Sequence, residues 1–266
     1  MKKILSAVVA VLLVLSMLGG CSKPQAEAPV ITEPSTVSTE ATAAPTVETE
    51  PTPSEETAPT EEAGIVVLDS IDPAYAQPIA RYYKAISEQW DESTCFDQEI
   101  SPMVAFYYEG NGLDNVGFAC VDLDGNQIQE LIIGAIKNAE QDPLVFEVWT
   151  LINGEPVMVA QSSAHNRHYL QYADEDGLWY ISYVAENGAA NHAVYCLQMF
   201  DGKLEVSQGV IFDAAFDEAA PWFMAYDLDW DVSNDTPIDE DLANAVIDAH
   251  MRIYTTAEYI PYSQYQ

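Results

Sequence analysis

Basic residues are scarce in this chain of 266 residues. Nine Lys and Arg stand against 43 Asp and Glu, and the formal net charge is −34. Most of the excess lies in residues 65–266, which hold 34 acids and six bases. A folded part this acidic repels phosphate backbones and anionic headgroups. The composition therefore excludes nucleic acid as a partner and favours metal cations, basic partners or neutral ligands.

Familiar catalytic motifs are absent as well. The sequence holds no G-x-S-x-G, Walker A, G-x-G-x-x-G or H-E-x-x-H pattern. Histidines are few, and His165, His168 and His192 fall in polar loops or at strand ends that a β-meander could bring together around zinc. They follow no fixed ligand spacing, so ordinary loop histidines are the favoured interpretation. We expect His250 to be a packed or capping residue of a C-terminal helix.

Cysteine is also rare, with four residues in the chain. Beyond Cys21, the remaining three cannot all pair within one chain. Cys120 and Cys196 both lie in expected strands and could form a disulfide across the sheet, and Cys95 would then stay free. Buried free thiols are the alternative.

The one long apolar run is too short to span a bilayer. It covers about fifteen residues from Ile4 to Leu18, behind Lys2 and Lys3, whereas a spanning helix needs roughly 20. The sequence Leu18-Gly19-Gly20-Cys21 resembles a bacterial lipobox. We expect residues 1–20 to be a lipoprotein signal peptide. Cys21 would carry acyl chains such as palmitate and hold the protein on the extracytoplasmic face of the cell membrane. The alternatives are an uncleaved anchor helix or an ordinary signal with a chance cysteine.

Aromatic residues are missing from the whole N-terminal part, since all 28 lie in residues 65–266. Residues 21–64 are rich in Pro, Thr and Glu and would bury too little apolar area to offset the entropy of ordering. We expect them to form a disordered, extended stalk. Residues 65–266 are long enough for a single folded extracellular domain.

The pattern of this domain predicts an α+β fold. Apolar residues at helical spacing indicate helices over 78–90 and 239–254. Between them the period changes to two, which predicts an antiparallel β-meander of about eight or nine strands, with turns at Asn153-Gly154, Asp176-Gly177 and Asp201-Gly202. The expected strands are 116–122, 130–137, 145–152, 156–161, 168–172, 178–185, 193–200, 204–211 and 222–228.

A weak repeat at an offset of about 48 runs through the meander. Residues 148–161, with an Asn-Gly turn, align with residues 196–209, with an Asp-Gly turn. Two blade-like sheets of four strands would explain it, whereas a full propeller needs more blades than this length holds. A local likeness of two hairpins is the alternative.

The strongest local motif lies between two expected strands. If Asp122 is position 1, side chains with oxygen atoms stand at positions 1, 3, 5 and 9, which are Asp122, Asp124, Asn126 and Glu130. The backbone carbonyl of Ile128 lies at position 7. A hard cation such as Ca²⁺ takes six to eight oxygens at ~2.3–2.6 Å, and such a loop can wrap them around one point. Position 12 is Ile133 and apolar strands flank the loop, so an EF-hand is excluded. We expect a structural calcium site.

This loop resembles the strand–loop–strand calcium loops of FG-GAP repeats, as found in integrin propellers. It departs from their pattern because Gln127 stands where a glycine normally allows the sharp turn, and because there is one copy. The alternative is a wide turn in which Asp and Asn side chains cap backbone amides.

A second acidic run contains Asp227, Asp229 and Asp231, followed by Asp235. If the run is a strand, alternation places the first three on one face. That face is either a further cation site or, as we favour, a charged outer face that deters edge-to-edge pairing.

The layout of the chain resembles uncharacterised surface lipoproteins of anaerobic Gram-positive bacteria. Besides the lipobox, the stalk and a Tyr-rich helix, the segments that carry this resemblance read VDLDGNQIQELIIG, VFEVWTLINGEPV, RHYLQYADEDGLWY and a closing TPIDEDLANAVIDAHMRIYTTAEYIPYS. It implies a location and the calcium loop, and no activity. We expect a non-enzymatic binding or scaffold module, with Trp149, Trp179 or Tyr180 touching a glycan or peptide unless they pack in the core. The alternative is an extracytoplasmic hydrolase with a carboxylate or His-metal site.

Overall fold

The computed structural model describes residues 71–136, 143–173, 177–251 and 254–265, without the side chains of Ala173 and His250. All of them belong to one compact unit, Pro59–Gln266. The expected signal peptide, the lipidated Cys21 and the stalk lie outside the described residues and stay predictions. Within the described residues, no helix combines the length and the apolar character that a membrane span requires.

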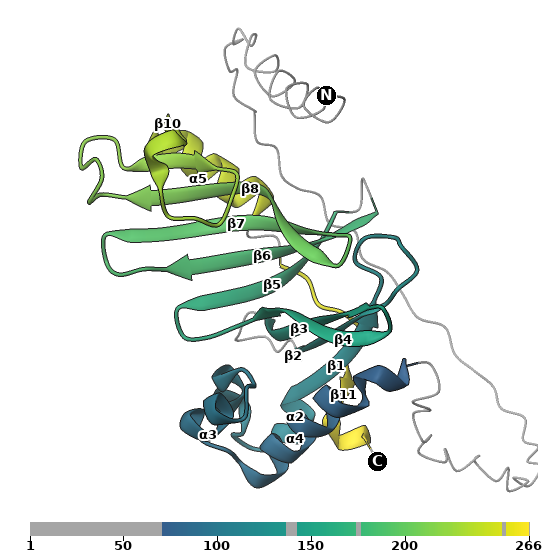
Figure 1. The fold of residues 1–266 in the computed structure, drawn as a ribbon. Helices are drawn as coiled ribbons and strands as arrows, with labels where there is room; N and C mark the ends of the chain where they lie inside the picture. The colour runs from purple at the N-terminus through teal and green to yellow at the C-terminus, as the bar shows by residue number, and fades with distance from the viewer. Residues whose placement is uncertain (1–70, 137–142, 174–176, 252–253, 266) are drawn as a thin grey trace, which may run out of the picture. The chain divides into compact units, whose positions relative to one another are not determined.

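The domain begins with a group of short helices (Figure 1). The longest, α2 (Ala76–Glu88), confirms the predicted helix at this place. It buries a stripe that includes Ile79, Tyr82 and Ile86, and it ends where Gln89 turns to a left-handed φ of 51°. The shorter elements around it were not predicted; they are η2 (Pro73–Tyr75), α3 (Glu92–Asp97), η3 (Pro102–Tyr107) and α4 (Gly112–Asn115).

Eleven strands form one antiparallel sheet, which confirms the α+β fold with a β-meander. Each of the nine predicted strands is present. The strands are β1 (Val116–Val121), β2 (Glu130–Ala135), β3 (Leu144–Ile152), β4 (Glu155–Gln161), β5 (Asn166–Ala173), β6 (Leu178–Glu186), β7 (Asn191–Phe200), β8 (Lys203–Asp213), β9 (Trp222–Ala225), β10 (Thr236–Ile238) and β11 (Ile260–Pro261). Their order is β10-β9-β8-β7-β6-β5-β3-β2-β1-β11, so the alternative of two separate blade-like sheets is wrong.

Three strands are paired on one side only, and each of them contains a proline. They are β10 and β11 at the two ends of the sheet and β4, which pairs with β3 alone. Their prolines are Pro237, Pro261 and Pro156, and the eight other strands contain none. Because proline lacks the N–H that a ladder needs, it is confined to such edges.

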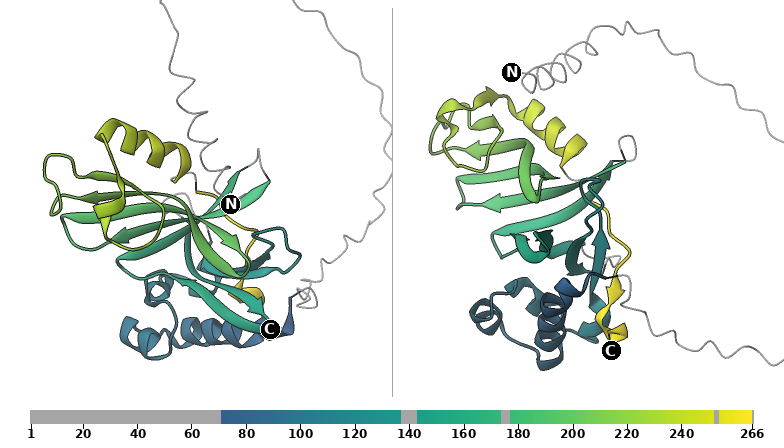
Figure 2. Two further views of the ribbon diagram at one scale, coloured as in Figure 1. Left: turned by 45° about the horizontal axis from the view of Figure 1, so that its top comes forward. Right: turned by 45° about the vertical axis from the view of Figure 1, so that its right-hand side comes forward.

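The two faces of the sheet are covered differently. On one face, the N-terminal helices pack over β1–β3 around residues such as Tyr82, Phe118 and Phe146. Farther along the same face, α5 (Glu240–His250) covers β7–β9 through Ala243 and Ile247 (Figure 2). The opposite face, which we call the inner face, buries apolar side chains from β1 to β9, and no α-helix of the described residues contributes to its core.

Helix α5 confirms the predicted C-terminal helix but is shorter. Asp239 caps its first turn by accepting a hydrogen bond from the Leu242 N–H at 2.8 Å. The helix ends at His250, and residues 252 and 253 of the predicted helix lie outside the described residues.

The repeat predicted from sequence has a structural counterpart in the hairpins β3–β4 and β7–β8. Their pairings match at an offset of 48, as in Glu147↔Gln161 and Tyr195↔Gly209. Both hairpins also shift register at the same place, between Val148 and Trp149 in the first and between Cys196 and Leu197 in the second. The shared feature is therefore a whole hairpin with its bulge.

The two hairpins nevertheless lie on the sheet with opposite faces inward. β4 and β5 share one edge of β3 and both run antiparallel to it. β7 therefore runs antiparallel to β3, while β8 lies on the same side of β7 as β4 does of β3. Superimposing one hairpin on the other reverses its strand direction but not its order across the sheet, and this rotation exchanges the two faces of the hairpin. Trp149 accordingly packs under the N-terminal helices, whereas its counterpart Leu197 packs on the inner face.

The prediction that Asp227–Asp231 continues a strand is wrong. β9 ends at Ala225, and the acidic run that follows bends through side-chain hydrogen bonds before η4 (Val232–Asn234). Each aspartate carboxylate accepts the N–H two residues on, as in Asp229 N–H to Asp227 Oδ1 at 3.2 Å. Short acidic side chains offer the backbone an alternative to the strand ladder.

Candidate functional site

The predicted cation loop joins β1 to β2, and the carboxylate of Asp122 organises it. This carboxylate accepts hydrogen bonds from the backbone N–H groups of Gly125, Asn126 and Gln127 at 2.7, 3.1 and 3.0 Å. Gly125 and Gln127 both adopt positive φ, 75° and 72°. Gln127 therefore takes the left-handed conformation for which the FG-GAP pattern reserves a glycine.

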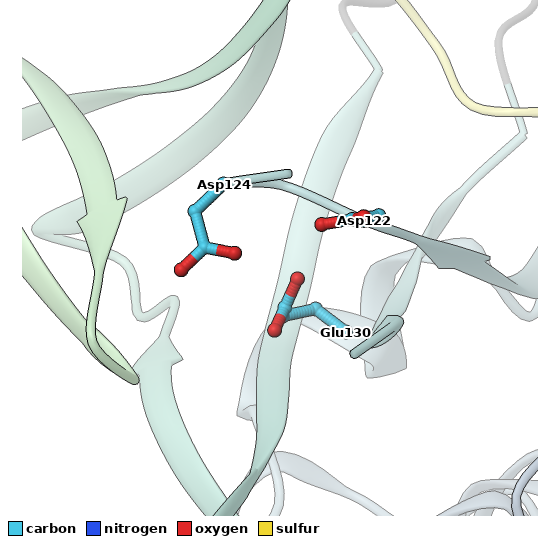
Figure 3. Close-up of side chains that lie close together, drawn as sticks. All are labelled: Asp122, Asp124 and Glu130. Atoms are coloured by element: carbon cyan, nitrogen blue, oxygen red, sulfur yellow. The ribbon is translucent and has the colours of Figure 1, made fainter. Parts of the chain in front are cut away.

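Three carboxylates converge at this loop. Oxygen atoms of Asp122, Asp124 and Glu130 all lie within 4.8 Å of one another, and the three side chains point toward a common space (Figure 3). Oxygens that share a cation at ~2.4 Å lie at most ~4.8 Å apart, so the spacing fits a hard divalent ion. Without one, each pair of charges repels by on the order of 3 kcal/mol at an effective dielectric constant of ~20.

Glu130 is the buried member of the group, with 0% of its surface exposed. Its carboxylate accepts hydrogen bonds from the Leu123 N–H and the Thr150 hydroxyl, both at 2.9 Å. Burial raises the pKa of Glu130, and the charge of Asp124 adds to the rise, while the two hydrogen bonds oppose it. The carboxyl is thus fixed at the start of β2 with its charge facing the other two.

The structure brings together three of the five predicted ligand residues. Asn126 lies beside them, since its Nδ2 donates to Asp124 Oδ2 at 3.0 Å, but its Oδ1 accepts the Ile128 N–H at 2.6 Å. In this arrangement the Asn126 Oδ1 stabilises the turn by accepting a backbone hydrogen bond. Both Asn126 and Ile128 are exposed.

The three histidines occupy separate environments and do not appear in the metal-type clusters of the described residues. His165 is exposed, and its Nδ1 lies 3.8 Å from Glu186. His192 stacks on Phe212 at 4.8 Å between ring centroids. His168 is buried and stacks on Tyr183 at 4.6 Å.

His168 also contacts a serine, but the pair is structural. Ser162 Oγ lies 3.1 Å from His168 Nδ1 and donates its proton to the Val145 carbonyl at 2.6 Å. With that proton committed, Nδ1 must be the donor, and the serine is not activated as a nucleophile. Burial lowers the pKa of His168 from 6.5 to about 4, so the ring is neutral near pH 7.

The three cysteines of the domain are free, and Cys120 is not paired with Cys196. Cys120 packs toward the N-terminal helices, whereas Cys196 lies under α5. Burial raises the pKa of each of these two thiols to about 11, so both are protonated and inert near neutral pH.

A second buried carboxylate, Glu147, was not singled out by its sequence pattern. It accepts hydrogen bonds from Ser101 N–H, Gln161 Nε2 and Trp149 Nε1 at 3.0, 3.0 and 2.8 Å, and Tyr82 also bonds to it. Burial raises its pKa, and these hydrogen bonds oppose the rise. Glu147 therefore ties α2, the segment before η3, β3 and β4 together.

A hollow with a volume of about 720 Å³ lies between β9, β10 and the start of α5. Phe212 and Trp222 supply aromatic surface, with their ring centroids 4.8 Å apart. Three exposed acids, Glu218, Asp239 and Glu240, also line it. Sequence reasoning missed this site because its residues come from four separate segments.

The aromatics predicted to touch a ligand lie elsewhere. Trp149 is a core residue that packs under the N-terminal helices. Tyr180 is half-buried and packs against the core beneath α5. Trp179 is half-buried beside the exposed Tyr172, with ring centroids 4.9 Å apart, and lines a smaller hollow of about 520 Å³.

Comparison of the chain with family models, with curated proteins and with solved structures returned no match. The resemblance to surface lipoproteins and to FG-GAP loops stays a prediction.

Proposed function

We propose that this protein is a surface lipoprotein, anchored through Cys21, whose domain is a non-enzymatic binding module for a cationic peptide. The observation that supports the binding function is the hollow beside Trp222. It combines an aromatic pair with three carboxylates, in a domain whose acids greatly outnumber its bases.

The chemistry of the hollow favours lysine or arginine side chains. A cation over the face of a tryptophan gains about 0.5–2 kcal/mol, and carboxylates at the rim add charge-assisted hydrogen bonds. Asp239 already accepts the Leu242 N–H as the cap of α5, so Glu218 and Glu240 are the rim acids that capping does not engage. Acidic surroundings also speed the approach of a basic partner.

Titration of the full chain, purified in detergent, with hexalysine and with a neutral chito-oligosaccharide tests the proposal. We expect hexalysine to bind and added salt to weaken it. Glu240→Gln and Trp222→Leu should reduce affinity by about ten-fold each, whereas Glu205→Gln, an exposed acid on β8, should not. Binding of the oligosaccharide alone would assign the hollow to glycans, and binding of neither would overturn the proposal.

We also propose that the Asp122–Glu130 loop holds a structural Ca²⁺. The convergence of three carboxylates within 4.8 Å supports it. Calcium should raise the melting temperature of the full chain, because an ion that binds only the native state stabilises it. Asp124→Asn should abolish this rise and Glu205→Gln should keep it. If calcium leaves the wild-type melt unchanged while Asp124→Ala still destabilises the protein, the loop is a turn.

The alternative of an extracytoplasmic hydrolase drew on a carboxylate site or on the three histidines. The described residues hold the histidines in three separate environments. Among the described residues, the group of three carboxylates within 4.8 Å of one another belongs to the cation loop, so we keep the binding module as the conclusion.

A further inference from the structure

A second loop repeats the oxygen spacing of the Asp122–Glu130 loop. Its acids stand at positions 1, 3, 5 and 9 of the segment that joins β9 to β10: Asp227, Asp229, Asp231 and Asp235. As in the first loop, the residue at position 9 directly precedes or opens the next strand. Both loops also set buried apolar residues into the core of the inner face, Leu123 in the first and Val232 in the second.

The second loop exposes Asp227, Asp229 and Asp231 and bends through their side-chain hydrogen bonds. Asp227, Asp229 and Asp231 each accept the backbone N–H two residues on, at 3.2, 2.9 and 3.1 Å. Trp230 and Val232 point the other way and pack on the inner face. Trp230 and Val232 thus pack in the core, whereas Leu228 stays 44% exposed beside the acids.

No described base neutralises the charges on this surface. Both ion pairs within the described part of the protein use Glu186, so none of its bases lies within 4 Å of the four aspartates. Asp227, Asp229 and Asp231 are exposed and Asp235 is half-buried. Four carboxylates therefore lie along one short loop with no ion-pair partner among the described residues.

An independent observation places an unsatisfied polar group beneath the loop. Tyr195 is 1% exposed, and its hydroxyl has no hydrogen-bond partner among the described residues. Its ring crosses Gly209 on β8, and Gly209 pairs with Ala225, the last residue of β9 before the loop. Burial raises the pKa of this hydroxyl, and the charges of Tyr183, Asp235, Asp227 and Asp229 add to the rise, so the hydroxyl lies within the field of three acids of the loop.

A buried hydroxyl without a partner costs about 1–3 kcal/mol. Here it lies beside uncompensated carboxylates, and one hydrated cation would satisfy both. A cation accepts the carboxylate oxygens as ligands, and a water in its shell donates to the phenol oxygen.

We propose that the Asp227–Asp235 loop is a second divalent-cation site of the Ca²⁺ class, with these aspartates as ligands and the Tyr195 hydroxyl hydrogen-bonded to a cation-bound water. Its oxygens are not as close as those of the first loop, which alone among the described residues brings three carboxylates within 4.8 Å. The second loop must therefore tighten on binding, and we expect it to have the lower affinity of the two.

Calorimetric titration of the full chain with Ca²⁺ tests the proposal independently of the first loop. We expect two ions for each wild-type chain and one for Asp229→Asn. This substitution removes charge but keeps an oxygen that can accept the Asp231 N–H, and Glu205→Gln is the matched control. Asp124→Asn should abolish the tighter event and leave the weaker one. If Asp229→Asn and the wild type bind the same number of ions, the second site is overturned whether or not the first one binds.

Two further variants test the geometry. Tb³⁺ can replace Ca²⁺, and Trp230 within the loop should sensitise its luminescence; Trp230→Phe should therefore remove most of the emission and keep the calcium stoichiometry. Tyr195→Phe removes a hydroxyl that makes no hydrogen bond in the protein, and it should weaken the lower-affinity site by about ten-fold with the melting temperature in EDTA maintained. Unchanged affinity in Tyr195→Phe would overturn the role of the hydroxyl.

Discussion

The ring of Tyr195 lies directly across Gly209, its partner on the neighbouring strand. A Cβ at position 209 would stand 2.8 Å from Tyr195 Cε1 and closer still to Cδ1. The same row continues through Tyr183, which stacks on Tyr195, to His168, so three rings lie side by side on β5, β6 and β7. The glycine provides the space that this row requires.

Gly209→Ala should destabilise the protein by about 1–3 kcal/mol, because the new methyl group collides with the ring. Urea unfolding measures the change. In a Tyr195→Leu background the same substitution should cost much less, because residues in contact are not additive. An equal cost in both backgrounds would show that the ring is not the cause.

His168 should make stability fall as the pH is lowered. Its pKa is depressed to about 4 in the folded protein from an ordinary 6.5, so the unfolded state binds the proton first. The stabilisation is complete above pH 6.5 and is lost as the pH falls toward 4, amounting to about 3 kcal/mol. In His168→Gln, the free energy of unfolding should change less between pH 6.5 and pH 4 than it does in the wild type. His165→Gln, at an exposed histidine, should retain the wild-type slope; equal slopes in all three proteins would refute the assignment.

Glu147 should make the stability of the protein fall as the pH is raised, the opposite of the effect of His168. Its pKa is raised above the ordinary 4.5, so the folded state holds the proton longer than the unfolded state does. Its contribution to stability is therefore present below pH 4.5 and falls as the pH rises from there. Glu147→Gln should remove this fall, measured as unfolding free energy relative to the wild type.

Truncation of Glu147 should be costly at any pH. Glu147→Ala leaves the Trp149 Nε1–H without its acceptor and takes one of two acceptors from the Ser101 N–H and from Gln161 Nε2, and we expect a loss of about 3 kcal/mol. Glu155→Ala, at an exposed position of β4, should cost less than about 0.5 kcal/mol. A similar loss for both variants would contradict the role of Glu147 as a tie between elements.

Gln127→Gly should stabilise the apo protein, since Gln127 adopts a φ of 72° that glycine reaches without strain. The gain should be about 1 kcal/mol, the usual order of the left-handed penalty. Gln127→Ala is the control, because it shortens the side chain and keeps the penalty. If the glycine and alanine variants had the same melting temperature, the backbone at this position would be unstrained.

Local periodicity was enough to predict the nine longer strands and the two longer helices. It could not predict β10 and β11, because three and two residues are too few to show a period. It misplaced Asp227–Asp231, because alternation along a sequence does not reveal that the side chains bond to their own backbone. Tertiary contacts, not propensity, distinguish such cases.

The candidate sites divide in the same way. The spacing of Asp122, Asp124 and Glu130 is local, and the structure does bring these three carboxylates together. The hollow beside Trp222 depends on Phe212 of β8, Glu218 of the segment between β8 and β9, and Glu240 of α5 lying close together, and no spacing along the chain encodes that arrangement.

The prolines of the three edge strands restrict how a partner can be recognised. A peptide that extends a sheet needs a free row of N–H and C=O groups, and Pro156, Pro237 and Pro261 interrupt each row that is open. Such a peptide would add poorly to β4, β10 or β11, and a second copy of the chain would meet the same obstacle. Recognition is thereby left to side chains, which distinguish partners by charge and shape, whereas a backbone ladder would accept many sequences alike.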